Sequence, residues 1–96
     1  MLKSHYAPRT PLRILSFGAR QPGDAAESGL LSFGGDSAGF AVAEILPGDA
    51  EAAAPLLFAA LRKLDSAGVS RIYAREISES GLGMAIMDRL RRASHE

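Results

Sequence analysis

Cysteine is absent from this 96-residue sequence, and histidine is scarce. Without cysteine the chain has no disulfide framework, no thiolate nucleophile and no cysteine-based metal site. Its two histidines, His5 and His95, lie at opposite ends of the sequence, which disfavours a histidine metal cluster. No serine or carboxylate stands in a glycine elbow or near a histidine that could activate it. We therefore expect no metal site and no catalytic residue in this chain.

An excess of either charge is also missing, because 11 acidic residues balance 11 basic ones. This balance removes the main argument, from sequence alone, for a protein that binds nucleic acids or membrane surfaces. No apolar run approaches the roughly 20 residues that span a bilayer. The amino-terminal stretch MLKSHYAPRTP also lacks the apolar segment of a secretory signal. We expect one small globular domain, located in the cytoplasm.

Residues 40–77 show the pattern strand, turn, helix, turn, strand. Residues 40–46 (FAVAEIL) lack a clean polar alternation, which predicts a strand covered on both faces. From Asp49 the apolar residues follow a helical period, and Gly68 is expected to end that helix in a left-handed conformation. A strand pattern returns at residues 69–77. A helix that joins two strands in this way predicts a parallel βαβ unit and an α/β fold.

Two further strands are expected at residues 12–17 and 29–33. With the strands at 40–46 and 69–77 they make a mostly parallel four-stranded sheet. The loop at residues 18–28 is rich in small residues and has room for one helical turn at most.

The two ends of the chain complete the organisation. Residues 78–96 predict an amphipathic helix, the second of two main helices. Pro8 and Pro11 disfavour helix near the amino terminus, so residues 1–11 are expected to form an extended arm. We therefore divide the chain into an arm at residues 1–11 and a domain at residues 12–96.

The central helix contains a proline, Pro55, which costs about 3 kcal/mol in a helix interior. The helix is therefore expected to have a kinked or two-part start. Leu56 and Phe58 flank its apolar stripe on opposite sides. They can cover the sheet and a neighbouring helix, or they can contact a partner, in which case the chain is a self-association module.

Arg89 falls on the apolar stripe of the last predicted helix, where an unpaired charge is costly. Asp65 opposes the dipole of the central helix from its last turn. Each side chain needs a partner, so we predict an ion pair between Asp65 and Arg89, with Glu76 as the alternative acceptor. The functional alternative for Arg89 is phosphate binding.

Gly81 and Gly83 at the start of the last helix could let an anion approach the helix N-terminus. The dinucleotide-binding fingerprint fails, because Ile86 occupies the position of its third glycine. Close packing of the helix against the preceding strand is the simpler use of these glycines. A free-standing nucleotide-binding domain that uses the glycines and Arg89 is an alternative function.

Three stretches together carry a family resemblance: SHYAPRTPL at residues 4–12, LFAALRKLDSAG at 57–68 and SGLGMAIMDRLRRAS at 80–94. In order and spacing they resemble the linker and carboxy-terminal domain of the two-domain L-threonylcarbamoyladenylate synthases. The resemblance is weakest at residues 14–46, where the sequence is shorter and poorer in helix than many family members. The helix that follows the first strand in a full Rossmann-like arrangement is therefore expected to be missing or reduced. It implies a small Rossmann-like domain.

The resemblance also implies a function. Enzymes of that family condense threonine, bicarbonate and ATP to threonylcarbamoyl-AMP, which supplies the threonylcarbamoyl group of a modified adenosine in tRNA. Their catalytic machinery, with ATP and Mg²⁺, belongs to an amino-terminal domain that would be the partner of this chain. Met1 resembles the methionine of a Pro-Gly-Met linker motif, so a fragment of a longer protein is expected.

In that family the linker crosses the substrate cleft of the catalytic domain. By residue match, His5, Tyr6 and Pro8 would face the cleft. An imidazole and an amphipathic ring can close over a nucleotide and exclude water. The resemblance thus implies a non-catalytic domain that anchors a lid, and it leaves contact between tRNA and Arg89, Arg91 and Arg92 open.

Overall fold

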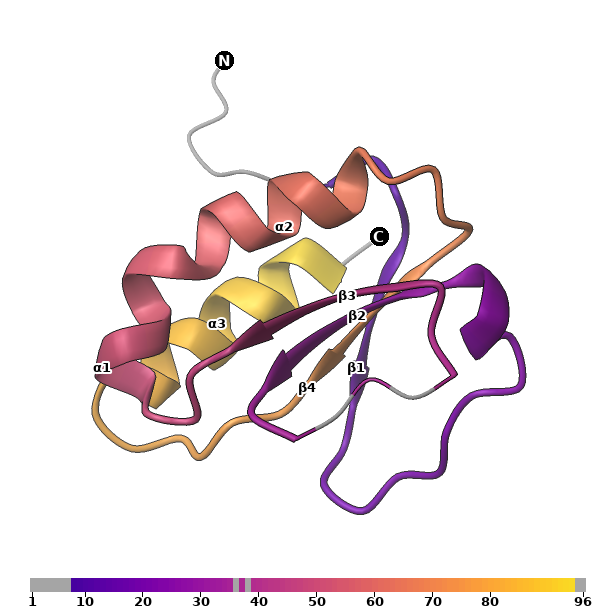
Figure 1. The fold of residues 1–96 in the computed structure, drawn as a ribbon. Helices are drawn as coiled ribbons and strands as arrows, with labels where there is room; N and C mark the ends of the chain where they lie inside the picture. The colour runs from indigo at the N-terminus through magenta and orange to yellow at the C-terminus, as the bar shows by residue number, and fades with distance from the viewer. Residues whose placement is uncertain (1–7, 36, 38, 95–96) are drawn as a thin grey trace.

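The computed structural model describes residues 8–35, 37 and 39–94. In this part of the chain four parallel strands form one sheet in the order β1-β4-β2-β3, and the helices gather on one of its faces (Figure 1). The elements are β1 (Leu12–Leu15), the 3₁₀ turn η1 (Ala25–Glu27), β2 (Gly29–Phe33), β3 (Val42–Leu46), α1 (Ala50–Ala53), the 3₁₀ turn η2 (Ala54–Leu56), α2 (Leu57–Asp65), β4 (Ile72–Arg75) and α3 (Leu82–Ser94). The predicted small Rossmann-like α/β sheet with two main helices, α2 and α3, is confirmed.

The main core lies between the helices and the sheet. Leu57, Leu61 and Leu64 recur at helical spacing on α2, and all three are buried. On α3 the same spacing buries Ile86 and Leu90 in the same cluster. Among the described residues, no helix is both long and apolar enough to cross a membrane.

The central helix has the two-part start that Pro55 predicted. α1 ends at Ala53, Pro55 lies in η2, and the regular helix α2 begins only at Leu57. The Asp49 side chain caps α1 by accepting the N–H of Ala52 at 3.3 Å. Gly68 follows α2 with φ +79°, a left-handed conformation that costs glycine little.

The opposite face of the sheet is partly covered by the loop between β1 and β2. Among the described residues, no α-helix lies on this face. Tyr73 and Leu30 are buried there with Leu15, and the ring of Phe40 meets Tyr73 edge-on at 6.2 Å between centroids. The Tyr73 hydroxyl donates to Oδ1 of Asp24 at 2.7 Å, which fixes the loop that contains η1. The expected reduction of the helix after the first strand is thus confirmed.

The prediction that the strand at residues 40–46 is covered on both faces is wrong. β3 is an edge strand, and its Val42 and Ile45 remain 38% and 42% exposed. Ile45 lies beside Ser32 on the face without helices. An apolar run without alternation does not distinguish a central strand from an edge strand of this kind.

Candidate functional site at the base of the amino-terminal arm

Asp65, the last residue of α2, holds the chain segment that leads into β1. Its Oδ1 accepts the backbone N–H of Thr10 at 2.8 Å, and its Oδ2 accepts that of Arg9 at 3.1 Å. The Thr10 hydroxyl donates to the main-chain oxygen of Asp65 at 3.4 Å. Hydrogen bonds to a carboxylate are roughly twice as strong as neutral ones. We call Arg9, Thr10 and Asp65 the arm anchor, because they fix the base of the arm to the end of α2.

The arm anchor also explains why an acid is tolerated at this helix end. A carboxylate at the C-terminus of a helix faces the negative end of the helix dipole, so the sequence predicted that Asp65 needs a partner. The backbone N–H groups of Arg9 and Thr10, 56 and 55 positions earlier in the sequence, are such partners. Sequence reasoning missed them, because a backbone donor carries no side-chain signal.

Arg89 is half-buried on α3, with its guanidinium carbon 4.7 Å from the centroid of the Phe58 ring. The positive charge of Arg89 therefore lies over the ring of Phe58, and this contact connects α3 with α2. Glu76, the alternative acceptor for Arg89, accepts the N–H of Phe17 at 3.0 Å. The ion pair between Asp65 and Arg89 stays a prediction.

Arg89→Gln is expected to lower the free energy of unfolding by about 0.5–1 kcal/mol, the value of a partly exposed cation–π contact. A double-mutant cycle with Phe58→Leu in urea denaturation measures the coupling of the two side chains. Equal losses with and without Phe58 would contradict the contact. The same cycle with Asp65→Asn tests the predicted ion pair, which additive effects would rule out.

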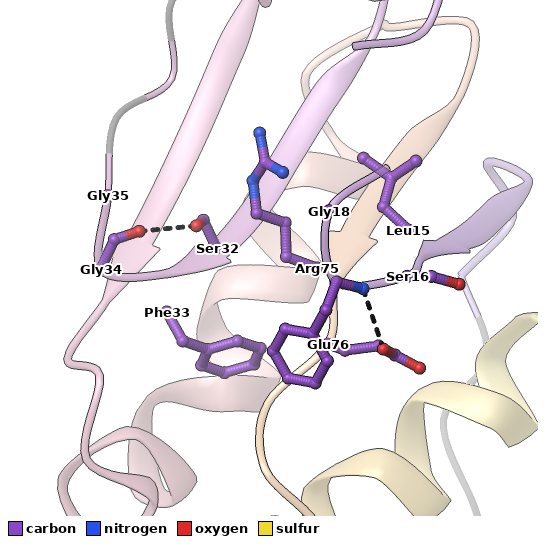
Figure 2. Close-up of a pocket in the computed structure, with 10 residues that line it drawn as sticks. Leu15, Ser16, Gly18, Ser32, Phe33, Gly34, Gly35, Arg75 and Glu76 are labelled. Carbon is purple, nitrogen blue, oxygen red and sulfur yellow. Dashed lines mark hydrogen bonds between the residues drawn. The ribbon is translucent and has the colours of Figure 1, made fainter. Parts of the chain in front are cut away.

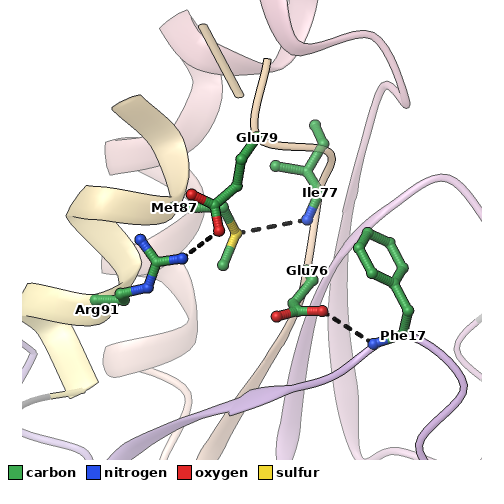
Figure 3. A network of polar contacts seen from close by, with 6 residues as sticks. All are labelled: Phe17, Glu76, Ile77, Glu79, Met87 and Arg91. Atoms are coloured by element: carbon green, nitrogen blue, oxygen red, sulfur yellow. Dashed lines mark hydrogen bonds and ion pairs between the residues drawn. The ribbon is translucent and has the colours of Figure 1, made fainter. Parts of the chain in front are cut away.

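The other two arginines of α3 each have a carboxylate partner. Arg91 pairs with Glu79, as Figure 3 shows, and Arg92 pairs with Asp88 at 3.3 Å. The same view shows the N–H of Ile77 donating to the Met87 sulfur at 3.5 Å, which joins the end of β4 to α3. These ion pairs reduce the free positive charge of the helix, and a contact with tRNA stays untested.

Gly81 and Gly83 differ in what surrounds them. Gly83 is buried, and a Cβ added to it would collide with the carbonyl oxygen of Ser78. Gly81 has φ +56° with open space around it. Gly83 therefore permits the close packing that the sequence favoured, and an anion site at this helix start stays a prediction.

The predicted cleft-facing residues lie just before the arm anchor. His5 and Tyr6 are outside the described residues. Pro8 is described and half-buried, next to Arg9. Within the described ranges, no three His, Asp or Glu side chains are grouped so that they could hold a metal ion.

Comparisons with known proteins agree with this fold. A threonylcarbamoyl-AMP synthase of Pyrococcus abyssi (strain GE5 / Orsay) is 55% identical over 38 residues, which are 40% of this chain and 11% of that protein. A solved structure of P. abyssi Sua5, in which a histidine and the following tyrosine are replaced by alanine, matches with a TM-score of 0.61 and 36% identity. The match covers 71% of this chain and 21% of that one, so the chain spans about a fifth or less of these relatives. The family model for "Threonylcarbamoyl-AMP synthase, C-terminal domain" matches residues 1–95, and the chain therefore belongs to that family.

Proposed function

We propose that this chain is a non-catalytic accessory domain that anchors the linker of a two-domain threonylcarbamoyl-AMP synthase. The arm anchor carries the proposal, because Asp65 binds the backbone directly after the segment that contains His5, Tyr6 and Pro8. In this view residues 1–11 are the end of the linker and residues 12–96 are the accessory domain.

The chemistry belongs, in this proposal, to an amino-terminal catalytic domain of the same polypeptide. That domain would bind ATP and Mg²⁺ and condense threonine, bicarbonate and ATP to threonylcarbamoyl-AMP for tRNA modification in the cytoplasm. Family membership supports this assignment, and so does the small share of the relatives, 11% and 21%, that the chain covers.

The arm anchor limits where the cleft-facing side chains can go. An extended chain spans at most about 3.5 Å per residue, so the backbone of Tyr6 stays within roughly 11 Å of Arg9 and that of His5 within roughly 14 Å. We call residues 5–8, which would close over a bound nucleotide, the gate. Because the arm anchor already restricts the gate, less conformational entropy is lost when the gate closes. Asp65 thus acts as a positioning residue for the gate.

Asp65→Ala in the full-length enzyme is expected to lower kcat/KM for threonylcarbamoyl-AMP formation about tenfold, since the charged acceptor of two hydrogen bonds is lost. The rate is measured as ATP- and threonine-dependent release of pyrophosphate. Glu51→Ala is the matched control, because Glu51 is an exposed acid on α1, away from the arm anchor. It is expected to leave the rate unchanged.

A second comparison separates anchoring from a general loss of stability. His5→Ala and Tyr6→Ala should also lower kcat/KM, and Asp65→Ala should add little to either, because all three act through one arm. Amide exchange at Arg9 and Thr10 reports whether Asp65→Ala releases the arm. Faster exchange at these two amides with an unchanged rate would contradict the anchoring function.

A further inference from the structure

A pocket of about 330 Å³ lies where three parallel strands end (Figure 2). In open parallel sheets, ligands bind outside the carboxyl ends of the strands, where the connections leave towards opposite faces. The chain after β4 leads to α3 on the helical face, while the chain after β1 leads to the loop on the other face. The pocket is lined by Leu15, Ser16, Phe17, Gly18, Ser32, Phe33, Gly34, Gly35, Arg75 and Glu76.

Arg75 supplies the positive charge of this pocket. Its register neighbour on β1 is Leu15, and it lies on the face of the sheet without helices. Figure 2 shows its guanidinium pointing away from the Glu76 carboxylate. Within residues 8–35, 37 and 39–94, no carboxylate lies within 4.0 Å of it. Glu76 is instead occupied by the N–H of Phe17.

Two glycine turns add backbone donors at the rim of the pocket. Gly18 and Gly35 have φ +76° and +80°, and neither N–H donates to an acceptor in the described part of the chain. The N–H of Gly34, by contrast, donates to the Leu46 oxygen at 2.8 Å. Ser32 holds this second turn through a 2.7 Å hydrogen bond from its hydroxyl to the Gly34 oxygen. The cation of Arg75 and two backbone N–H groups without an acceptor in the described part of the chain thus border one cavity.

We propose that this pocket binds a small molecule through an oxyanion, a phosphate or a carboxylate, held by Arg75. The planar fork of a guanidinium matches both groups by two parallel hydrogen bonds. Phe17 at the rim is 69% exposed, so its ring offers a flat surface on which a heteroaromatic part of the ligand can stack. The site lies at the opposite end of β1 from the arm anchor, and the proposal does not rest on the proposed function.

Titration of the ¹⁵N-labelled chain with inorganic phosphate, AMP and succinate at constant ionic strength tests the proposal. Saturable amide shifts are expected at Gly18, Gly34, Gly35 and Arg75 for at least one of the three anions. A response to phosphate and AMP assigns a phosphate ligand, and a response to succinate alone assigns a carboxylate. Tighter binding of AMP than of phosphate, lost in Phe17→Ser, would show that the ring contributes.

Arg75→Gln is expected to weaken the binding at least about tenfold, because a charge-assisted contact is lost. Arg62→Gln, which changes an exposed arginine on α2, is the matched control and should bind normally. If glutamine disturbs the fold, Arg75→Lys keeps the charge, loses the planar fork and should bind more weakly. Absence of saturable shifts up to about 10 mM, a concentration that would fill most of a millimolar site, would overturn the proposal. Unchanged affinity in Arg75→Gln or in a folded Arg75→Lys would overturn it as well.

Discussion

Replacing Leu90 by alanine is expected to lower the free energy of unfolding by about 3 kcal/mol, a value within the range for buried leucines. Leu90 is 0% exposed in the main core between α3 and the sheet. Its removal leaves a cavity that the neighbouring helices fill only in part. Since small domains are stable by about 5–15 kcal/mol, this single change removes a large share of the total.

Leu82→Ala on the same helix is the matched control. Leu82 is 44% exposed at the start of α3, so its loss should cost less than about 1 kcal/mol. Urea denaturation followed by circular dichroism measures both variants. Equal losses would mean that α3 does not pack on the sheet through its Leu90 face.

The fold was largely predictable because its signals are local. The strand at residues 29–33 is bounded by glycines and was predicted with its observed limits, Gly29–Phe33. Pro55 predicted the divided start of the central helix for a reason contained in a single residue. Spacing on the last helix placed Leu82, Ile86, Leu90 and Ala93 on one apolar stripe. Ile86, Leu90 and Ala93 are buried, whereas Leu82 at the helix start is 44% exposed.

What the sequence did not predict depends on contacts between distant segments. The position of β3 at the sheet edge follows from the pairing of β2 with β4, which hydrophobic spacing does not encode. The resemblance to the synthases directed attention to His5, Tyr6 and Pro8, whereas the described contacts of the arm are backbone N–H groups of the next residues on Asp65.

The pocket at the strand ends was missed for a related reason. Arg89 drew attention because a charge on an apolar helical stripe is unusual, while an arginine at the end of a strand such as Arg75 is ordinary in sequence. Arg75 becomes a candidate ligand-binding residue only in the folded chain, where it lines one pocket with the turns at Gly18 and Gly35. A ligand site at this position and the arm anchor use opposite ends of β1, so one strand connects the two.

Gly83→Ala is the second change expected to have a large effect, a loss of about 2–3 kcal/mol in the free energy of unfolding. A methyl group at Gly83 would collide with the main-chain oxygen of Ser78, and a backbone atom cannot rotate away as a flexible side chain can. The N–H of Gly83 also donates to the main-chain oxygen of Ser80 at 2.9 Å. This hydrogen bond fixes the backbone at the helix start, so the backbone cannot easily shift to relieve the collision. Alanine normally favours a helix over glycine by about 1 kcal/mol, and the collision must outweigh this gain.

Gly81→Ala separates the collision from the conformational cost of leaving glycine. At Gly81 an added methyl meets open space, and only its φ of +56° is unfavourable, so a loss of about 1–2 kcal/mol is expected. The melting temperature and the urea midpoint of both variants are compared with those of the unchanged chain. A Gly83→Ala variant as stable as the unchanged chain would mean that close packing is not why glycine stands there. The anion site at the start of α3 would then become the better explanation for this glycine, because a backbone that must approach an anion also excludes a side chain.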